Sequence, residues 1–174
     1  MKYELTNESI NHPILTLYRI RALRDIPELG IKKGDLGGYV QSEINLLQHG
    51  LCWVSGDARV YGDAWVSGNA RVSGNARVYG NAWVSGNARV SGDARVYGNV
   101  WVYSNDSATK PIQVVTGFEY TAALTDNHLI IGCERHTFDH WIANGLEIIL
   151  NKGIPLKTAK KRFKLIKTLI ENKE

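Results

Sequence analysis

Arginine and aromatic residues recur at a fixed spacing in the middle of this sequence, and together they suit the binding of a phosphate-bearing molecule. The arginines that we expect to bind are Arg71, Arg77, Arg89 and Arg95, and the aromatic residues beside them are Tyr79, Tyr97 and Trp83. Guanidinium groups donate paired hydrogen bonds that fit phosphate oxygens. Aromatic rings stack on nucleobases. The pattern therefore predicts a nucleotide or cyclic nucleotide as the ligand.

A second group of residues has the types that bind zinc. These are His128, Cys133, His136 and His140. Zinc prefers imidazole and thiolate ligands, but this spacing lacks the paired cysteines of a reliable zinc site. The histidines also fit capping and packing positions near a helix start. We therefore expect structural histidines and no metal or cofactor, with the metal site kept as the weaker alternative.

The arginines belong to a run of six-residue repeats that extends from Gly50 to Tyr103. The nine units read GLCWVS, GDARVY, GDAWVS, GNARVS, GNARVY, GNAWVS, GNARVS, GDARVY and GNVWVY. So short a period is typical of a β-solenoid. Alternation along a strand sends the third and fifth positions, mostly Ala and Val, inward. Gly followed by Asn or Asp favours a tight corner. Cys52 falls at an inward position, as a small hydrophobic residue.

A longer period of eighteen residues orders the outward side chains into columns. Three hexads per coil would stack residues eighteen apart at about 4.8 Å on three flat faces. One face carries Arg59, Arg77 and Arg95 with Tyr61, Tyr79 and Tyr97. The next carries Trp65, Trp83 and Trp101, and the third carries Trp53, Arg71 and Arg89. Like charges stacked so closely repel each other. The cost is offset either by Asp57, Asp63, Asp93 or a partner's carboxylates, or by a bound anion.

The chain ends are expected to cap this repeat. We predict an N-terminal cap at 1–31, containing a strand at 14–23, and a β-helix at 32–109. Residues 32–49 would form an altered first coil, with Leu36, Val40 and Leu46 inside, because a solenoid needs a protected end. The segment 104–111 is expected to be a loop that leaves the pattern.

Residues 110–174 are expected to form a small α+β lobe. Strands are predicted at 112–115, 118–122 and 128–132, with a turn at 125–127. Thr137 is a suitable N-cap for a helix that continues to Asn151 and buries Trp141 and Ile142. A final helix, 156–172, pairs an apolar face that includes Leu156 with a face rich in lysine. That basic face is more typical of a solvated surface than of a nucleic-acid site.

The units VSGNAR and VYGDAR resemble the hexapeptide-repeat family, whose prisms are left-handed parallel β-helices. This resemblance implies the fold class, namely a mainly β, left-handed parallel β-helix with an N-terminal cap and a C-terminal α+β lobe. The flanking stretches LYRIRALRD, KKGDLGGYV and DNHLIIGCERHTFDHW are similar to uncharacterised hexapeptide-repeat proteins of bacteriophages and prophages. That similarity implies a small accessory phage protein that blocks a host process.

The same family suggests an enzymatic alternative, because many members are acyltransferases that bind acetyl-CoA between neighbouring prisms. Those enzymes use a histidine base, whereas no histidine lies between His49 and His128 here. Imidazole is the side chain best suited to act as a base at neutral pH. The repeat therefore favours binding over catalysis.

Assembly and location follow from surface composition. A column formed by Trp65, Trp83 and Trp101 would expose a large apolar strip, which favours burial in a homotrimer interface. A structural or protein-binding role, with a host protein as partner of this column or of the basic lobe, is the further alternative. The chain has 21 Lys and Arg against 17 Asp and Glu, a net charge of +4. With no apolar run long enough for a membrane span and no signal-peptide core, we expect a cytoplasmic protein of the bacterial host.

Overall fold

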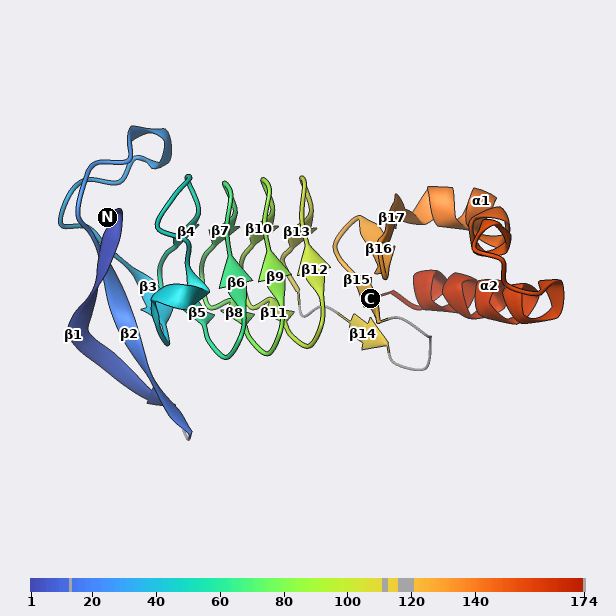
Figure 1. Cartoon of the computed structure of the whole chain (residues 1–174), viewed down its shortest axis with the longest axis horizontal. Coiled ribbons are helices and arrows are strands. Elements are labelled where there is room, and N and C mark those ends of the chain that lie inside the picture. Colours follow the sequence, from blue (N-terminus) through green and yellow to red (C-terminus); the bar gives the residue numbers. More distant parts are fainter. Residues whose placement is uncertain (13, 111–112, 116–120, 174) are drawn as a thin grey trace.

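A stack of very short parallel strands forms the middle of the molecule, and the computed structural model describes residues 1–12, 14–110, 113–115 and 121–173 (Figure 1). The strands are β4 Trp53–Val54, β5 Arg59–Val60, β6 Trp65–Val66, β7 Arg71–Val72, β8 Arg77–Val78, β9 Trp83–Val84, β10 Arg89–Val90, β11 Arg95–Val96, β12 Trp101–Val102 and β13 Ser107–Ala108. They stack in the orders β5-β8-β11, β4-β7-β10-β13 and β6-β9-β12. The predicted β-solenoid is therefore confirmed, while its left-handedness stays a prediction.

The register of these strands places equivalent residues of the repeat above one another. Arg59 pairs with Arg77, and Arg77 pairs with Arg95. Trp65 pairs with Trp83, and Trp83 pairs with Trp101. The predicted columns are thus present in the structure.

The interior is filled by the third and fifth residues of each unit, as predicted. Every Ala and Val at these positions from Val54 to Val102 is at most 1% exposed. Gly86 illustrates why glycine opens each unit, because its φ is +64° and an added Cβ would lie 2.7 Å from the backbone nitrogen of Ser104. Asparagine amides link successive corners, as in the contact from Asn69 to Asn87 at 3.1 Å. Small residues therefore let neighbouring coils approach closely.

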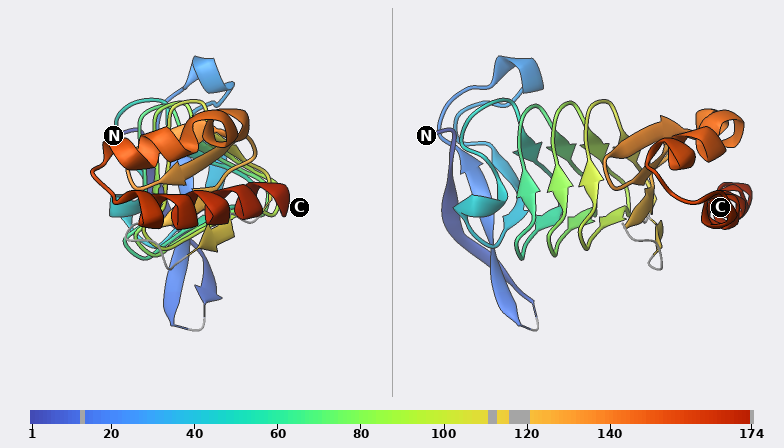
Figure 2. Two further views of the ribbon diagram at one scale, coloured as in Figure 1. Left: turned by 90° about the vertical axis from the view of Figure 1, so that its right-hand side faces the viewer. Right: turned by 45° about the vertical axis from the view of Figure 1, so that its right-hand side comes forward.

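The N-terminal end of the prism is covered by a hairpin of β1 Tyr3–His12 and β2 Leu15–Ala22 (Figure 2). The chain continues through the 3₁₀ turn η1 Pro27–Leu29, strand β3 Leu36–Val40 and the 3₁₀ turn η2 Glu43–Asn45. Strand β3 pairs antiparallel with β2 and parallel with β5, which joins the cap to one prism wall. Strand β2 confirms most of the predicted strand 14–23, whereas β1 was not predicted.

Two predictions at this end were wrong. Leu36 is 48% exposed, because Val40 pairs with Val60, twenty residues away, which shifts the frame and leaves Leu36 outside the interior. Trp53 was placed outside but is only 5% exposed. The ring of Tyr3 packs edge-on against Trp53 with centroids 6.4 Å apart, because the N-terminal residues fold over this wall. Val40, Leu46 and Cys52 are fully buried as predicted.

The C-terminal lobe is an antiparallel sheet followed by two helices. Its elements are β14 Gln113–Val115, β15 Ala122–Leu124, β16 His128–Ile131, β17 Glu134–Thr137, α1 Phe138–Asn151 and α2 Leu156–Glu171. Thr137 caps α1 as predicted, since its side chain accepts a hydrogen bond from the backbone of His140. Trp141 is buried, whereas Ile142 and Leu156 were wrongly predicted to be buried and are 45% and 52% exposed. Both lie outside the apolar cluster where α1, α2 and the sheet meet.

The predicted loop 104–111 was wrong in its described part, because residues 104–109 continue the repeat pattern. Ser107 and Ala108 form β13, which pairs with β10, and Ala108 is 1% exposed. Ser104 takes the place of the corner glycine with a positive φ of 58°. Residues 104–109 therefore form a tenth unit, which was not recognised in the sequence because serine replaces glycine and Asp106 replaces the inward alanine.

Strand β17 of the lobe was not predicted either, and part of the predicted strand 118–122 lies outside the described residues. The three-part division at residues 31 and 109 stays a prediction.

Candidate functional site

The expected ligand-binding arginines occupy two different walls of the prism. Arg77 on β8 and Arg95 on β11 stack directly, and Arg59 extends their column. Arg71 on β7 and Arg89 on β10 stack in the separate sheet β4-β7-β10-β13. A single protomer therefore brings the predicted arginines together as two pairs and not as one cluster.

The side chains of these columns have no carboxylate partner in the described part of the chain. No ion pair forms there with Arg59, Arg71, Arg77, Arg89 or Arg95. Asp93, one of the carboxylates expected to offset them, instead accepts a hydrogen bond from Asn75 at 3.1 Å. Stacked guanidiniums without a counter-charge repel each other, so an anion bound beside them would relieve that cost.

Tyrosines form a stacked ladder beside the Arg59, Arg77 and Arg95 column. Tyr61 and Tyr79 lie 5.1 Å apart with planes 4° from parallel, and Tyr79 and Tyr97 lie 5.4 Å apart with planes 13° from parallel. Burial raises the pKa of Tyr61, while the nearby arginines oppose that shift. Because Tyr79 is stacked between two other rings, its hydroxyl and ring edge are its remaining contact groups. A ligand would stack more readily on the end of the ladder at Tyr97.

Tryptophans form the corresponding column on the wall β6-β9-β12. Trp65 contacts Trp83 edge-on at 5.2 Å, and Trp83 stacks on Trp101 at 5.2 Å. Trp83 is 41% exposed and Trp101 is 50% exposed. The column is therefore held in place by its own ring contacts and presents apolar surface to its surroundings.

A hollow of about 480 Å³ lies beside Arg71. It is lined by residues of the prism wall, including Trp53, Ser55 and Ser73, and by residues of the cap, including Ile31 and Leu36. No pattern in the sequence predicted this hollow, because it depends on how the cap folds over the wall. It places apolar surface, hydroxyl groups and the acidic residue Asp35 around the same space as Arg71.

The residues of the alternative metal site have other contacts. His136 contacts Glu134 at 2.9 Å and stacks on His140 with centroids 4.5 Å apart. His128 contacts Asp106 at 2.8 Å, and Cys133 is exposed. No group of three or more His, Cys, Asp or Glu side chains that could hold a metal occurs among the described residues.

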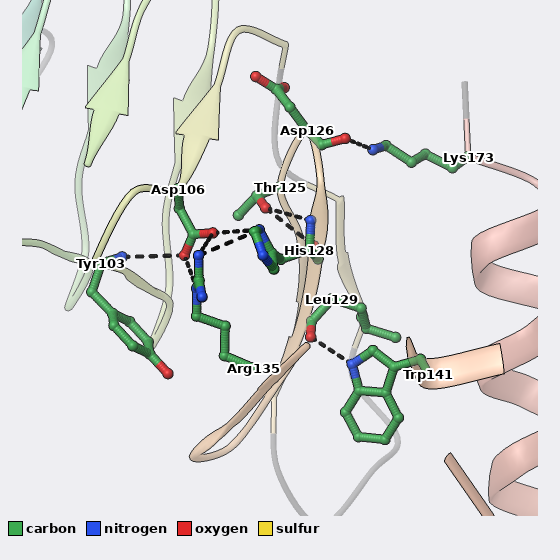
Figure 3. Close-up of polar contacts among 9 residues, drawn as sticks. All are labelled: Tyr103, Asp106, Thr125, Asp126, His128, Leu129, Arg135, Trp141 and Lys173. Carbon is green, nitrogen blue, oxygen red and sulfur yellow. Dashed lines mark hydrogen bonds and ion pairs between the residues drawn. The ribbon is translucent and has the colours of Figure 1, made fainter. Parts of the chain in front are cut away.

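A buried carboxylate joins the last coil of the prism to the lobe (Figure 3). Asp106 is 1% exposed and accepts two hydrogen bonds from the guanidinium of Arg135, both at 2.7 Å. His128 contacts the same carboxylate, and the backbone N–H of Tyr103 donates to it at 3.4 Å. Arg135 also lies 5.6 Å from the ring of Tyr103. The network was not found from the sequence, although an aspartate at an inward repeat position was a usable signal.

The stability of this network should depend on pH through His128. Burial lowers the pKa of His128 from its ordinary value of 6.5, and Arg135 and His136 act in the same direction, although Asp106 opposes them. The unfolded chain therefore takes up this proton at a higher pH than the folded chain. We expect the contribution of His128 to the free energy of unfolding to be complete above pH 6.5, where the ring is neutral in both states. This contribution should be lost progressively as the pH falls from 6.5 through the folded-state pKa of His128.

Urea denaturation between neutral and mildly acidic pH measures this effect. His128→Gln should flatten the dependence, because glutamine can still donate to Asp106 but does not titrate in this range. His49→Gln, at an exposed position, is the control and should leave the dependence unchanged. An unchanged slope in His128→Gln would contradict the assignment.

Comparison with protein families identifies the repeat. Residues 54–68, 70–86 and 88–104 match the family model described as the YdcK Beta solenoid repeat. The match covers the coils that carry the arginine, tyrosine and tryptophan columns, and it agrees with the repeat β-helix seen in the structure. No curated protein matches the chain. None of the described helices has the length and apolar character needed to span a membrane.

Proposed function

We propose that this β-solenoid protein is a non-catalytic binding protein that captures a phosphate-bearing small molecule on its arginine columns. The observation that carries the proposal is the absence of a carboxylate partner for Arg59, Arg71, Arg77, Arg89 and Arg95 in the described chain. Phosphate oxygens are suitable acceptors for such guanidinium groups. A nucleotide or cyclic nucleotide adds a base that can stack at the end of the tyrosine ladder or lie against the hollow beside Arg71.

The proposed site lies between protomers of a homotrimer. The pair Arg77 and Arg95 and the pair Arg71 and Arg89 occupy different walls, so an interface that joins these walls would bring the pairs together. Trp83 and Trp101 lie on the third wall, β6-β9-β12, and their exposure supports association more generally, because a trimer whose contacts extend to that wall would remove their apolar rings from water. The groove would then repeat by symmetry in each protomer contact.

The biological role that we propose is sequestration. The flanking sequences resemble phage and prophage proteins, and binding without turnover fits removal of a nucleotide signal that a bacterial host uses in its response to infection. The site of action would be the host cytoplasm. Acyl transfer is less well supported, because the repeat units between Gly50 and Tyr103 contain no histidine that would act as a base. The basic face of α2 remains a candidate surface for a host protein or, less favoured, nucleic acid.

Calorimetric titration against mono-, di- and cyclic nucleotides tests the proposal. Arg77→Ala and Arg89→Ala are each expected to weaken binding by about ten- to a hundredfold, the effect of one charge-assisted hydrogen bond of about 1.5–3 kcal/mol. Lys160→Ala removes the same charge from the exposed face of α2 and serves as the control. The proposal fails if no nucleotide gives heat, or if the control loses as much affinity as the two column variants.

A further inference from the structure

The hollow beside Arg71 combines groups of opposite charge with apolar walls. Its volume of about 480 Å³ lies within the range of small-molecule pockets, roughly 300–1,000 Å³. Asp35 and Arg71 both line it, yet no ion pair joins these two described residues. Its apolar part is formed by Leu29, Ile31, Leu36 and Trp53. The hollow therefore fits a ligand that offers an anionic group, N–H donors and a flat apolar body.

The carboxylate of Asp35 is held in place by the turn that precedes β3. Its Oδ2 accepts a hydrogen bond from the backbone N–H of Lys32 at 2.8 Å. The backbone carbonyl of Asp35 accepts another from the N–H of Ala22, at the end of β2, at 2.9 Å. Its Oδ1 accepts no hydrogen bond from any other residue in the described part of the chain. A positioned carboxylate oxygen is thus available to a donor group of a ligand.

The charged groups around the hollow are ordered along the prism axis. The cap lies at one end, and β4, β7 and β10 follow in that order away from it (Figure 1). Asp35 belongs to the cap, Arg71 to β7 and Arg89 to β10. At about 4.8 Å per coil, β4 and β10 lie roughly 10 Å apart, a length that one mononucleotide spans. A phosphate held by Arg71 and Arg89 would therefore leave the base beside Asp35.

We propose that this hollow binds guanine and makes the protein selective for guanine nucleotides, an inference that rests on the proposed function because the same arginines hold the phosphate. The Watson–Crick edge of guanine presents two adjacent donors, N1–H and the 2-amino group, to the carboxylate of Asp35. Adenine and cytosine present an amino group beside an unprotonated ring nitrogen, and uracil presents one N–H between two carbonyls. In those three bases an acceptor would face the carboxylate, which is unfavourable.

The other lining residues suit the rest of a nucleotide. Leu36 is 48% exposed and, with Ile31, offers apolar surface that the purine ring would cover. The hydroxyl groups of Ser55 and Ser73 belong to the coils of β4 and β7, where the ribose would lie. The exposure of Leu36 outside the prism interior is thereby given a use.

The test is calorimetric titration of the full chain with GMP, IMP and AMP, which share ribose and phosphate. GMP should bind about tenfold more tightly than IMP, which lacks only the 2-amino group, and AMP should bind more weakly than GMP. Asp35→Asn should remove the preference for GMP over IMP, because the amide has one acceptor oxygen in place of two. Asp25→Asn is the matched control. That carboxylate also accepts a backbone N–H, from Lys33 at 2.7 Å, but lies outside the hollow, so the preference should persist.

Leu36→Gln tests where the base lies without touching the carboxylate. Because Leu36 is already half exposed, the variant should fold, weaken GMP and IMP severalfold and leave their ratio unchanged. Equal affinity for GMP, IMP and AMP in the unmodified protein, or a GMP preference that survives in Asp35→Asn, would overturn the guanine assignment while the proposed function stands. If Asp35→Asn fails to fold, the comparison of the three nucleotides on the unmodified protein still decides. Absence of heat from every nucleotide would overturn both proposals.

Discussion

Replacing Arg135 by methionine is expected to lower the free energy of unfolding by about 3–5 kcal/mol, because it leaves the buried carboxylate of Asp106 without its cation. Asp106→Ala should cost less. The side chain of Asp106 is fully buried, whereas the side chain of Arg135 is 19% exposed. The guanidinium of Arg135 can therefore reach water when Asp106 is removed. The asymmetry arises because an unpaired charge is more costly in the interior than near the surface.

The double variant Asp106→Ala with Arg135→Met provides the matched control. It restores the alanine that most units carry at the inward position, and it removes both charges together. Its stability should be well above that of Arg135→Met alone. Urea denaturation of the unmodified protein, the two single variants and the double variant measures the coupling free energy between Asp106 and Arg135. Losses below about 1 kcal/mol in both single variants, as for an exposed ion pair, would show that the network does not hold the lobe to the prism.

Trp83→Glu is expected to convert the proposed homotrimer into a monomer at micromolar concentration. A carboxylate placed in the tryptophan column would be desolvated without a partner, at a cost of roughly several kcal/mol for each copy even after relaxation. Because the ring of Trp83 contacts both Trp65 and Trp101, the change also interrupts the column. Nucleotide affinity should fall in parallel if the binding groove lies between protomers.

Light scattering gives the masses needed for this comparison. Trp83→Phe should stay trimeric because it keeps an aromatic ring at the position, and Ile142→Glu should stay trimeric because the substitution lies on the exposed side of α1. A monomeric unmodified protein would contradict the interface and, with it, the intersubunit pocket. A trimer that tolerates Trp83→Glu would place the interface on another wall.

Much of the prism could be predicted because each hexad repeats one local rule. Each unit has Gly with Asn or Asp at the corner and Ala and Val inside, and this rule predicted columns of outward residues eighteen positions apart. The pairing of Arg59 with Arg77 confirms the columns. The ends were harder, since they depend on contacts that no short pattern encodes. Val40 pairs with Val60, twenty residues away, so Leu36 lies outside the interior and not inside it as predicted. Tyr3 covers Trp53, so Trp53 is buried and not exposed as predicted.

The candidate site was only partly predictable for the same reason. The eighteen-residue spacing predicted that Arg77 lies above Arg95 and that Tyr79 lies between Tyr61 and Tyr97, and both predictions are confirmed. The near-parallel stacking of the rings, which occupies both faces of Tyr79, was not predicted. The tenth unit was missed because Asp106 replaces the inward alanine. A buried aspartate is explained only by the guanidinium of Arg135, which comes from the lobe and donates two hydrogen bonds to it. The carboxylate network depends on how β16 and β17 pack.

Native mass spectrometry of the protein purified from bacterial cells tests the central claim most directly, namely that the arginine columns hold a phosphate-bearing small molecule. The predicted result is a trimer that carries the added mass of a nucleotide, which is released chemically unchanged on denaturation and is absent from Arg77→Ala and Arg89→Ala. A ligand-free protein that also fails to take up any mono-, di- or cyclic nucleotide, or a bound nucleotide that is chemically converted, would contradict it.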